Sequence, residues 1–507
     1  MTRLVLLFQF FLLNIFLSTY VLAKYTRIVQ TDKGKVRGNI LETIHLKRRY
    51  SAFKGIPYAE PPIGYGRRFR RPVPAKPWSR VLNATEDPND CAQWQFTLNP
   101  NDRHIGSEDC LYLNVYTPEL NFTNPRPRAV MAYIHGGAFQ FESIHSSKLG
   151  PDFLIEKDVV VVVMNYRLGV FGFLAIAPAY FDANNGLRDQ AEALRWIQRN
   201  IRKFGGDPDK VTLFGESAGA ASVEYHKLSP QSKDLFRASI AMSGAALNEW
   251  AYFPSRQSAY MGWHFVGSLL NYWSDEEDLY RQMVHKNQIP FRPTNEDKSV
   301  KDPFLPYHPL KLYRSGQFTA KPHMLGVMKD EGISFVALIS IVTDILGNSF
   351  TKRLSSSLTD VFFIKDIDLT QRFLSTHSKA PVYYYMNSFD YDQALHKVDA
   401  MKSKPGAGHG DDIAHIFWVN NKRQPIDPNS DIGRHRQRMV TMWTNFAKYL
   451  KPILNDDHNL GNVSWEESGT NGGYLDINRN LIFHANSRPI SENTAKMEYD
   501  RAIHGEY

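Results

Sequence analysis

A serine at position 217 lies in a sequence pattern that suits a nucleophile. Residues 211–222 begin with a short apolar run, continue as Gly-Glu-Ser-Ala-Gly at 215–219, and end in small residues. The glycines permit a sharp strand-to-helix turn that lifts one hydroxyl clear of the backbone, where larger side chains would clash. We therefore predict that Ser217 is a nucleophile, and the alternative is an ordinary glycine-rich turn.

A serine that attacks a carbonyl group also needs hydrogen-bond donors for the oxyanion that forms. Upstream of Ser217, residues 133–139 read Tyr-Ile-His-Gly-Gly-Ala-Phe, so an apolar strand opens into two glycines. Backbone N–H groups can approach a substrate there without side chains in the way. We expect Gly137, Ala138 and Ala218 to supply the donors, and the alternative is a plain turn at the end of a strand.

A serine hydroxyl is a poor nucleophile at neutral pH, so it needs a base, and the base needs a group that orients it. The acid candidate is Glu331, which follows an apolar run, and its neighbour Asp330 is a rival that the local sequence does not exclude. Of the 17 histidines, His409 is the base candidate because glycines flank it and indicate a loop. The order Ser217, Glu331, His409 is the one that a nucleophile elbow of this kind uses.

Short apolar strands and amphipathic helices must position these residues. A helix is predicted over residues 187–204, where apolar side chains recur at three- and four-residue steps, and a second helix ends at Pro452. Strands are expected at residues 36–40, 50–53, 111–116, 129–134, 159–166, 211–216, 238–242, 324–327 and 382–386. A strand, a helix and a strand at this spacing predict a parallel sheet. We predict an α/β fold, with a mostly parallel central sheet, helices on both faces and a single domain over residues 24–507.

The first 23 residues have the features of a secretory signal peptide. Arg3 is followed by an almost wholly apolar stretch, and small residues at 21–23 offer a cleavage site. The alternative is an N-terminal membrane anchor, and no later run reaches the roughly 18 apolar residues of a membrane helix. Three sequons, at Asn83, Asn121 and Asn462, would be glycosylated surface sites in a secreted protein.

The two cysteines, Cys91 and Cys110, stand 19 positions apart. In an oxidising compartment they can close one small loop, and the alternative is a pair of free buried thiols. Two thiols without paired histidines nearby disfavour a zinc site, and the chemistry predicted above needs no metal or organic cofactor.

The net charge of +8 includes two short basic clusters, at residues 47–49 and 67–71. No nucleic-acid-binding motif accompanies them, so we interpret them as a solvated basic surface and expect no nucleic-acid partner. The sequence gives no prediction for the oligomeric state.

Seven stretches of the chain together resemble one known family. They include His-Gly-Gly-Ala-Phe at 135–139 and Gly-Glu-Ser-Ala-Gly at 215–219, and they cover residues 52–62, 107–116, 135–139, 165–173, 185–190, 204–208 and 214–220. In this order they resemble type-B carboxylesterases, the cholinesterase-like branch of the α/β-hydrolase fold. The resemblance implies Ser217 as nucleophile, Glu331 as acid, His409 as base and a disulfide between Cys91 and Cys110.

The chain also departs from the family pattern near the expected site. Leu98 stands where cholinesterases carry the tryptophan that receives the choline ammonium, so a choline ester is a disfavoured substrate. Glu142 replaces a usual glycine and would narrow or charge the mouth of the pocket. The 78 positions from Glu331 to His409 are fewer than usual, which predicts a more open site, although a defect in the gene model would give the same interval.

Two functions fit these observations. The first is a secreted serine hydrolase of small carboxylic esters that works through an acyl-enzyme on Ser217. The second is a binding or adhesion protein that keeps the scaffold without catalysis. Such proteins typically lose the nucleophile, the histidine or the oxyanion loop, and Ser217, His409 and the loop at 135–139 are all present here.

Overall fold

The structure is a computed structural model of the 507-residue chain. It describes residues 24–64, 66–94, 104–176, 182–255, 258, 291–296, 298–336, 348–397, 405–422, 424–457 and 460–505. The predicted signal peptide and Leu98 lie outside these ranges.

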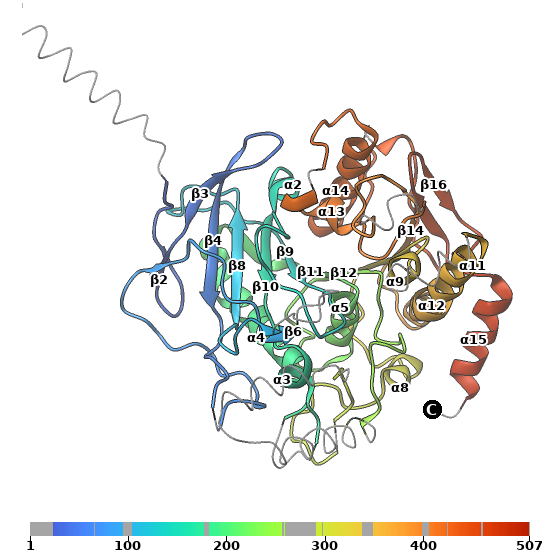
Figure 1. Cartoon of the computed structure of the whole chain (residues 1–507), viewed down its shortest axis with the longest axis horizontal. Helices are drawn as coiled ribbons and strands as arrows, with labels where there is room; N and C mark the ends of the chain where they lie inside the picture. Colours follow the sequence, from blue (N-terminus) through green and yellow to red (C-terminus); the bar gives the residue numbers. More distant parts are fainter. Residues whose placement is uncertain are drawn as a thin grey trace, which may run out of the picture.

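One 11-stranded sheet runs through the molecule, from the blue strands at one side of Figure 1 to the red strands at the other. Its strand order is β16-β15-β14-β13-β12-β11-β9-β10-β8-β4-β3. The strands are β3 (Asn39–Glu42), β4 (Arg49–Pro57), β8 (Tyr112–Thr117), β9 (Arg128–Ile134), β10 (Val160–Met164), β11 (Gly206–Glu216), β12 (Ala238–Met242), β13 (His323–Met328), β14 (Val382–Asn387), β15 (Tyr474–Ile477) and β16 (Leu481–His484).

The strands from β10 to β15 in this order pair in parallel. Antiparallel strands flank them: β8, β4 and β3 on one side and β16 on the other. Two small sheets lie outside the main one, formed by β1 (Val29–Gln30), β2 (Lys35–Arg37) and β5 (Leu82–Asn83), and by β6 (Gln93–Trp94) and β7 (His104–Ile105).

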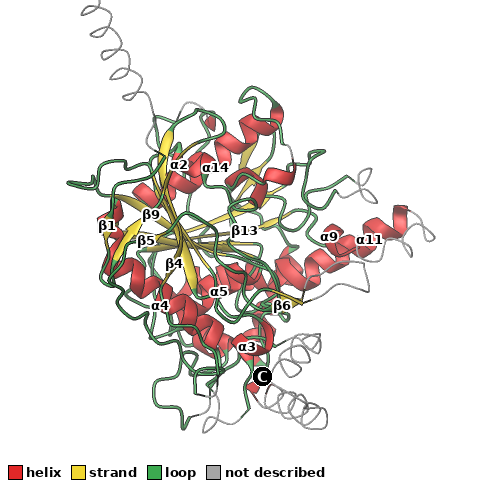
Figure 2. Ribbon diagram, turned by 60° about the vertical axis from the view of Figure 1, so that its left-hand side comes forward, coloured by secondary structure: helices red, strands yellow, loops and turns green. Residues whose placement is uncertain are grey.

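Helices cover both faces of the sheet, with α2 and α14 on one face and α4 and α5 on the other (Figure 2). The predicted fold class is therefore confirmed. The helices are α2 (Asp152–Ile155), α3 (Gly169–Phe173), α4 (Asn185–Asn200), α5 (Ala218–Leu228), α8 (Pro309–Arg314), α9 (Ile333–Val336), α11 (Asn348–Thr359), α12 (Lys365–His377), α13 (Ile413–Ile416), α14 (Asp431–Tyr449) and α15 (Glu492–His504). A π-helical turn (Asp360–Ile364) joins α11 to α12, and a 3₁₀ turn (Ile201–Phe204) follows α4.

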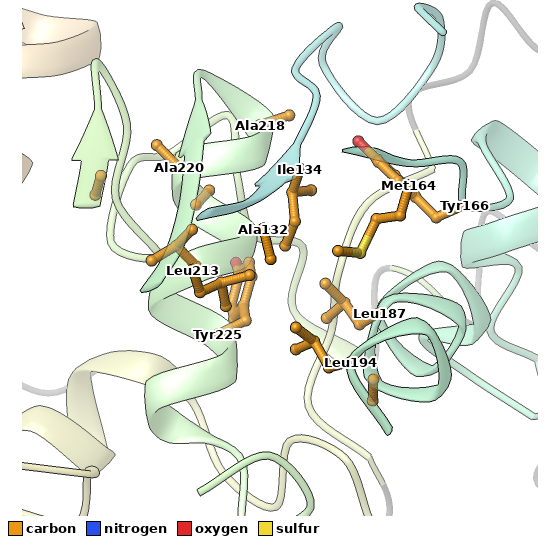
Figure 3. Packing of buried hydrophobic residues seen from close by; sticks show 14 of the residues in the cluster. Ala132, Ile134, Met164, Tyr166, Leu187, Leu194, Leu213, Ala218, Ala220 and Tyr225 are labelled. Carbon is orange, nitrogen blue, oxygen red and sulfur yellow. The ribbon is translucent and has the colours of Figure 1, made fainter. Parts of the chain in front are cut away.

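Alternate residues of each central strand enter different halves of the core. In β9, Ala132 and Ile134 pack with α4 and α5, whereas Met131 and Tyr133 belong to the cluster that includes Trp443 of α14. Figure 3 shows the first cluster from close by, with Leu187 and Leu194 of α4 near Ala132 and Met164. This period of two explains why the strands are apolar throughout: both faces of a parallel sheet are covered by helices.

Two local predictions were wrong in detail. The expected strand at 36–40 is divided at Gly38, whose Cβ, if present, would lie 2.1 Å from the carbonyl oxygen of Ala52. Residues on either side of Gly38 therefore pair in different sheets, β2 with β1 and β5, and β3 with β4. Strand β11 starts before the expected residue 211, at Gly206, and its pairing with β9 changes register between Gly206 and Val211.

Cys91 and Cys110 form a disulfide that ties the chain just before β6 to the chain entering β8. Both half-cystines are buried. Joining residues 19 positions apart removes conformations of the unfolded chain and so stabilises the folded state.

Replacing both cysteines by alanine is expected to lower the free energy of unfolding by about 3 kcal/mol, because a loop of this length loses its closure. Urea unfolding followed by tryptophan fluorescence measures the change. Dithiothreitol should destabilise the wild-type protein by a similar amount and leave the Cys91→Ala/Cys110→Ala protein unchanged. Equal unfolding midpoints for the wild-type and variant proteins, each with and without dithiothreitol, would contradict a stabilising role of the disulfide.

Candidate active site

Ser217 stands between β11 and α5 in a sharp turn. Its φ is +57°, a backbone conformation that residues other than glycine seldom adopt. A Cβ on Gly219 would lie 2.1 Å from the carbonyl oxygen of Ile134, so only glycine permits α5 to start this close to β9. The N–H of Ser217 donates to the carbonyl of Met242 at the end of β12, at 2.8 Å. The turn is thus held between the two strands that neighbour β11.

Ser217, His409 and Glu331 form one chain of hydrogen bonds. Ser217 Oγ lies 2.8 Å from His409 Nε2, and His409 Nδ1 lies 2.6 Å from Glu331 Oε2. The other carboxylate oxygen of Glu331 accepts the N–H of Met328 at 2.8 Å, and the side chain is fully buried. The rings of Phe363 and Phe335 pack against the imidazole, with centroids 4.7 and 5.5 Å away. The structure thus brings together three residues chosen from the sequence.

Asp330, the rival acid, has a different neighbour. Its carboxylate accepts the N–H of Ala407 at 3.1 Å, and its own N–H donates to the carbonyl of Ala407 at 2.9 Å. Ser334 Oγ donates to the carbonyl of His409 at 3.2 Å. Asp330 and Ser334 therefore fasten the histidine loop to the turn that carries Glu331, and Glu331 is the acid that contacts the imidazole.

The loop after β9 presents backbone N–H groups beside Ser217. Gly137, Ala138 and Phe139 have φ values of +88°, +53° and +62°, so three successive residues take left-handed conformations. Within the part of the chain that the structure describes, no acceptor is hydrogen-bonded to the N–H of Gly137, Ala138 or Ala218. Gly137 and Ala138 line the same cavity as Ser217, and Ala218 follows the serine in the chain. These groups can therefore receive a negatively charged oxygen.

His409 has more than one carboxylate near it. Glu216 Oε1 lies 3.3 Å from His409 Nε2, on the side of the ring that faces the serine. Burial lowers the pKa of the imidazole, but the charges of Glu216 and Glu331 outweigh burial and raise the pKa to about 9. Burial in turn raises the pKa of Glu216 to about 7, against the opposing effect of His409. The titrations of Glu216 and His409 are therefore coupled, because the charge of each group shifts the pKa of the other.

The sequence analysis missed Glu216 and Asp412. Asp412 is buried, and neither of its carboxyl oxygens has a hydrogen-bond partner among the described residues. Burial and the nearby Glu216 and Glu331 hold the pKa of Asp412 well above its usual value, which favours its neutral form. Position was the available signal, because Glu216 lies inside the nucleophile motif and Asp412 is three residues after His409. Burial, which raises the pKa of both carboxyl groups, cannot be recognised from a local sequence pattern.

A cavity of about 370 Å³ opens beside Ser217. Its apolar walls come from separate elements, and they consist of Tyr133, Phe141, Leu149, Phe335, Leu395, Ile413 and Val419. Glu142 also lines the cavity, where it pairs with Lys148 at 3.0 Å, so the expected charge at the pocket is present but neutralised. The cavity can hold an apolar group attached to a carbonyl carbon at Ser217.

The remaining predicted sites lie on the surface or outside the described ranges. Asn83, Asn121 and Asn462 are all exposed. Across the described ranges, no helix is both long enough and apolar enough to cross a bilayer. Over those same ranges, no three His, Cys, Asp or Glu side chains gather as a set of metal ligands.

Comparisons with known proteins identify the family. The model of the "Carboxylesterase family" matches residues 25–351 and 343–500. A "Juvenile hormone esterase" of Tribolium castaneum is 30% identical over 87% of this chain and 86% of its own length. A "Carboxylic ester hydrolase" of Bombus ignitus is 38% identical over 86% of this chain and 87% of its own.

A solved structure has the same fold. The juvenile hormone esterase of Manduca sexta, with OTFP covalently attached, superimposes with a TM-score of 0.81 at 28% identity, covering 94% of this chain and 99% of that one. The family match and the structural likeness extend over most of the chain, beyond the nucleophile motif alone. The protein is thus an enzyme of the α/β-hydrolase fold that belongs to the carboxylesterase family.

Proposed function

We propose that this protein is a secreted serine hydrolase of carboxylic esters that works through an acyl-enzyme on Ser217. The observation that carries the proposal is the continuous chain from Ser217 Oγ through His409 to Glu331, with contacts of 2.8 and 2.6 Å. It lies beside an apolar cavity and the N–H groups of Gly137, Ala138 and Ala218, to which no acceptor is bonded among the described residues. A nucleophile, a base, an orienting acid and oxyanion donors are the parts that acyl transfer needs.

In the first half of the reaction, His409 Nε2 takes the proton of Ser217 Oγ as the oxygen attacks the ester carbonyl carbon. The carbonyl oxygen becomes an oxyanion, which accepts hydrogen bonds from Gly137, Ala138 and Ala218. Glu331 holds the imidazole in the tautomer that leaves Nε2 free and stabilises the imidazolium. The imidazolium then gives its proton to the departing alcohol, and an acyl group remains on Ser217.

In the second half, water enters where the alcohol was and His409 takes one of its protons. The resulting attack forms a second oxyanion in the same place, and its collapse releases the carboxylic acid and restores the Ser217 hydroxyl. Glu216, 3.3 Å from Nε2, adds a charge that favours the imidazolium in both halves. Its carboxyl group therefore acts on the base rather than on the substrate.

The substrate class follows from the cavity walls and from the relatives. Apolar side chains of several elements form most of the lining, which favours an ester with an apolar acyl or alcohol group. Relatives named for juvenile hormone and for carboxylic esters in general are similar to this chain over most of its length. We propose uncharged carboxylic esters as substrates and treat juvenile hormone as one ester to be tested.

The alternative is a protein that binds a partner with this scaffold and does not catalyse. No observation on the described residues favours it, since Ser217, His409 and Glu331 contact one another. The first experiment below distinguishes the two functions.

Ser217→Ala is expected to abolish turnover of a short-chain aryl ester such as 4-nitrophenyl butyrate, with a loss of about 10⁴-fold or more, because acylation needs the hydroxyl. A fluorophosphonate should label the wild-type protein at Ser217 and leave the folded variant unlabelled, as circular dichroism and mass spectrometry would show. In a panel of esters, apolar substrates and juvenile hormone should be preferred to acetylthiocholine. A wild-type protein that is neither active nor labelled would support the binding function.

Removing the Glu216 charge should move the pH dependence of hydrolysis. The base must be neutral to accept a proton, so activity rises as pH passes through the pKa of His409, which lies near 9. A nearby carboxylate favours the imidazolium, and its removal lowers that pKa. Glu216→Gln should therefore shift the acidic limb of kcat/KM to lower pH by about one unit. Its plateau kcat should fall about tenfold, since the imidazolium of the transition state loses the same stabilisation.

The matched control for this experiment is Glu249→Gln, which removes an exposed carboxylate paired with Lys365. It should leave the acidic limb where the wild-type protein has it. An unchanged limb in Glu216→Gln, or a shift to higher pH, would show that Glu216 does not set the pKa of the base.

We further propose that the protein enters the secretory pathway and is glycosylated. The signal-like first 23 residues, the disulfide and the exposed Asn83, Asn121 and Asn462 support this. Expressed from the full chain in insect cells, the protein should accumulate in the medium without residues 1–23. Digestion with an N-glycosidase should reduce its mass, and replacing all three asparagines by glutamine should remove that shift. Retention in the cytosol with an intact N-terminus would contradict the proposal.

A further inference from the structure

The loop that carries the oxyanion donors does not hold its shape by backbone preference. Ala138, Phe139 and Glu142 all have positive φ, at +53°, +62° and +96°. A residue other than glycine in such a conformation costs about 1–3 kcal/mol and persists only where the surroundings impose it. The contacts that impose it therefore determine where the N–H groups of Gly137 and Ala138 point.

The beginning and the middle of this loop are held by the core and by the loop itself. The ring of Phe139 is fully buried against Phe173, and the carbonyl of Phe139 accepts the N–H of Gly169 at 2.7 Å. The carbonyl of Gly137 accepts the N–H groups of Gln140 and Phe141, at 2.8 and 3.1 Å. These bonds close the turn, but they leave its last residue, Glu142, to be fixed from outside.

Gln93 is the residue that fixes Glu142. Its side-chain oxygen accepts the N–H of Glu142, and its side-chain nitrogen donates to the carbonyl of Glu142, each at 2.9 Å. The same nitrogen donates to the carbonyl of Cys91, also at 2.9 Å. Gln93 is 4% exposed, so water does not compete for these bonds. One amide thus binds both polar groups of a single residue and prevents its rotation.

Gln93 itself stands on a rigid base. Cys91 is joined to Cys110 by the disulfide, and the N–H of Ala92 donates to the carbonyl of Ser107 at 3.0 Å. Because Gln93 is fixed, Glu142 is fixed too, and Glu142 and Phe141 lie in close contact with Gly137 of the oxyanion loop. A Cβ on Gly137 would lie 2.0 Å from the carbonyl oxygen of Phe141 and 3.1 Å from the Cβ of Glu142. Because the N–H of Phe141 also donates to the carbonyl of Gly137 at 3.1 Å, a displacement of residues 141 and 142 strains or breaks the contacts that fix Gly137.

We propose that Gln93 is a positioning residue for the oxyanion loop: by holding Glu142 at both backbone groups, it fixes the N–H groups of Gly137 and Ala138. The inference rests on the proposed function, because those groups matter only if an oxyanion forms at Ser217. Gln93 does not reach the reacting atoms. Its loss should weaken binding of the transition state while leaving binding of the ester in its ground state nearly intact.

The test replaces Gln93 by methionine, which keeps the length of the side chain and removes its hydrogen bonds. Rates are expressed per active site, counted by titration with a fluorophosphonate. In Gln93→Met, kcat should fall between 10- and 100-fold. This decrease does not exceed the decrease in kcat that follows removal of one oxyanion donor, and KM should stay within threefold of the wild-type value. Affinity for a trifluoromethyl ketone, which forms a tetrahedral adduct with the serine, should fall by the same factor as kcat. The acidic limb of the pH profile should stay in place, since His409 is not displaced.

Two further variants keep the test decisive. Gln93→Glu retains an acceptor for the Glu142 N–H but sets a buried carboxylate against the carbonyls of Glu142 and Cys91, so its kcat should also fall at least 10-fold below that of the wild type. If Gln93→Met does not fold, the kcat per titrated site of Gln93→Glu tests the positioning role instead. The matched control is Gln371→Ala, which removes a buried amide of α12 that donates to Ser468 Oγ and the carbonyl of Gly469. This control should lower thermal stability without changing kcat per titrated site.

A purely structural role for Gln93 would lower the melting temperature and the number of titrated sites but leave kcat per site and ketone affinity within twofold of wild type. That result would overturn the proposal. A wild-type protein that neither hydrolyses esters nor reacts with the fluorophosphonate would instead remove the proposed function, so the two failures are distinguishable.

Discussion

The close packing of α5 against β9 is the constraint on which the rest of the site depends. Gly219 approaches the carbonyl of Ile134 so nearly that no side chain fits between them, and this approach forces the chain to turn sharply at Ser217. The same β9 continues into the loop of Gly137 and Ala138. The nucleophile and the oxyanion donors therefore come from two neighbouring strands whose separation the sheet fixes, and neither needs a flexible element to reach the other.

Packing places the reacting groups, and nearby carboxyl groups determine the charge of the base. Glu216 and Glu331 both act on one imidazole, and burial holds the pKa of a third carboxyl group, Asp412, well above its usual value. Neither carboxyl oxygen of Asp412 has a hydrogen-bond partner among the described residues, so its ionised form would add an uncompensated like charge beside Glu216 and Glu331. The arrangement thus combines one carboxylate that orients the base, one whose pKa is raised to about 7 and one whose buried site favours the neutral form. This combination favours the imidazolium that forms in each half of acyl transfer.

Much of this could be predicted from the sequence, because it follows from local patterns. Apolar runs located the central strands, as at 129–134 within β9 (Arg128–Ile134) and at 238–242 for β12, since strands covered on both faces are apolar throughout. Small residues indicated the elbow, flanking glycines indicated His409, and the family resemblance favoured Glu331 over its neighbour Asp330. The division of residues 36–40 at Gly38 depends on a contact with Ala52 in another strand, and the roles of Glu216 and Asp412 depend on burial. Contacts between distant strands and burial arise only when the chain is folded, so they cannot be predicted from a short stretch of sequence.

Part of the cavity wall is strained backbone, and the contacts that hold it explain how the site is built. Ala138, Phe139, Glu142 and Ser217 have positive φ, and so does Ser243, which follows β12 and donates its N–H to the carbonyl of Gly326. Each such residue costs stability, about 1–3 kcal/mol, that an ordinary turn would not. At Ser217 the packing of glycine against a neighbouring strand offsets this cost, whereas the oxyanion loop relies on Phe139 in the core at one end and on Gln93 at the other. The strain is thus held by elements distant in sequence, which is why the donors can be rigid although they lie on a loop.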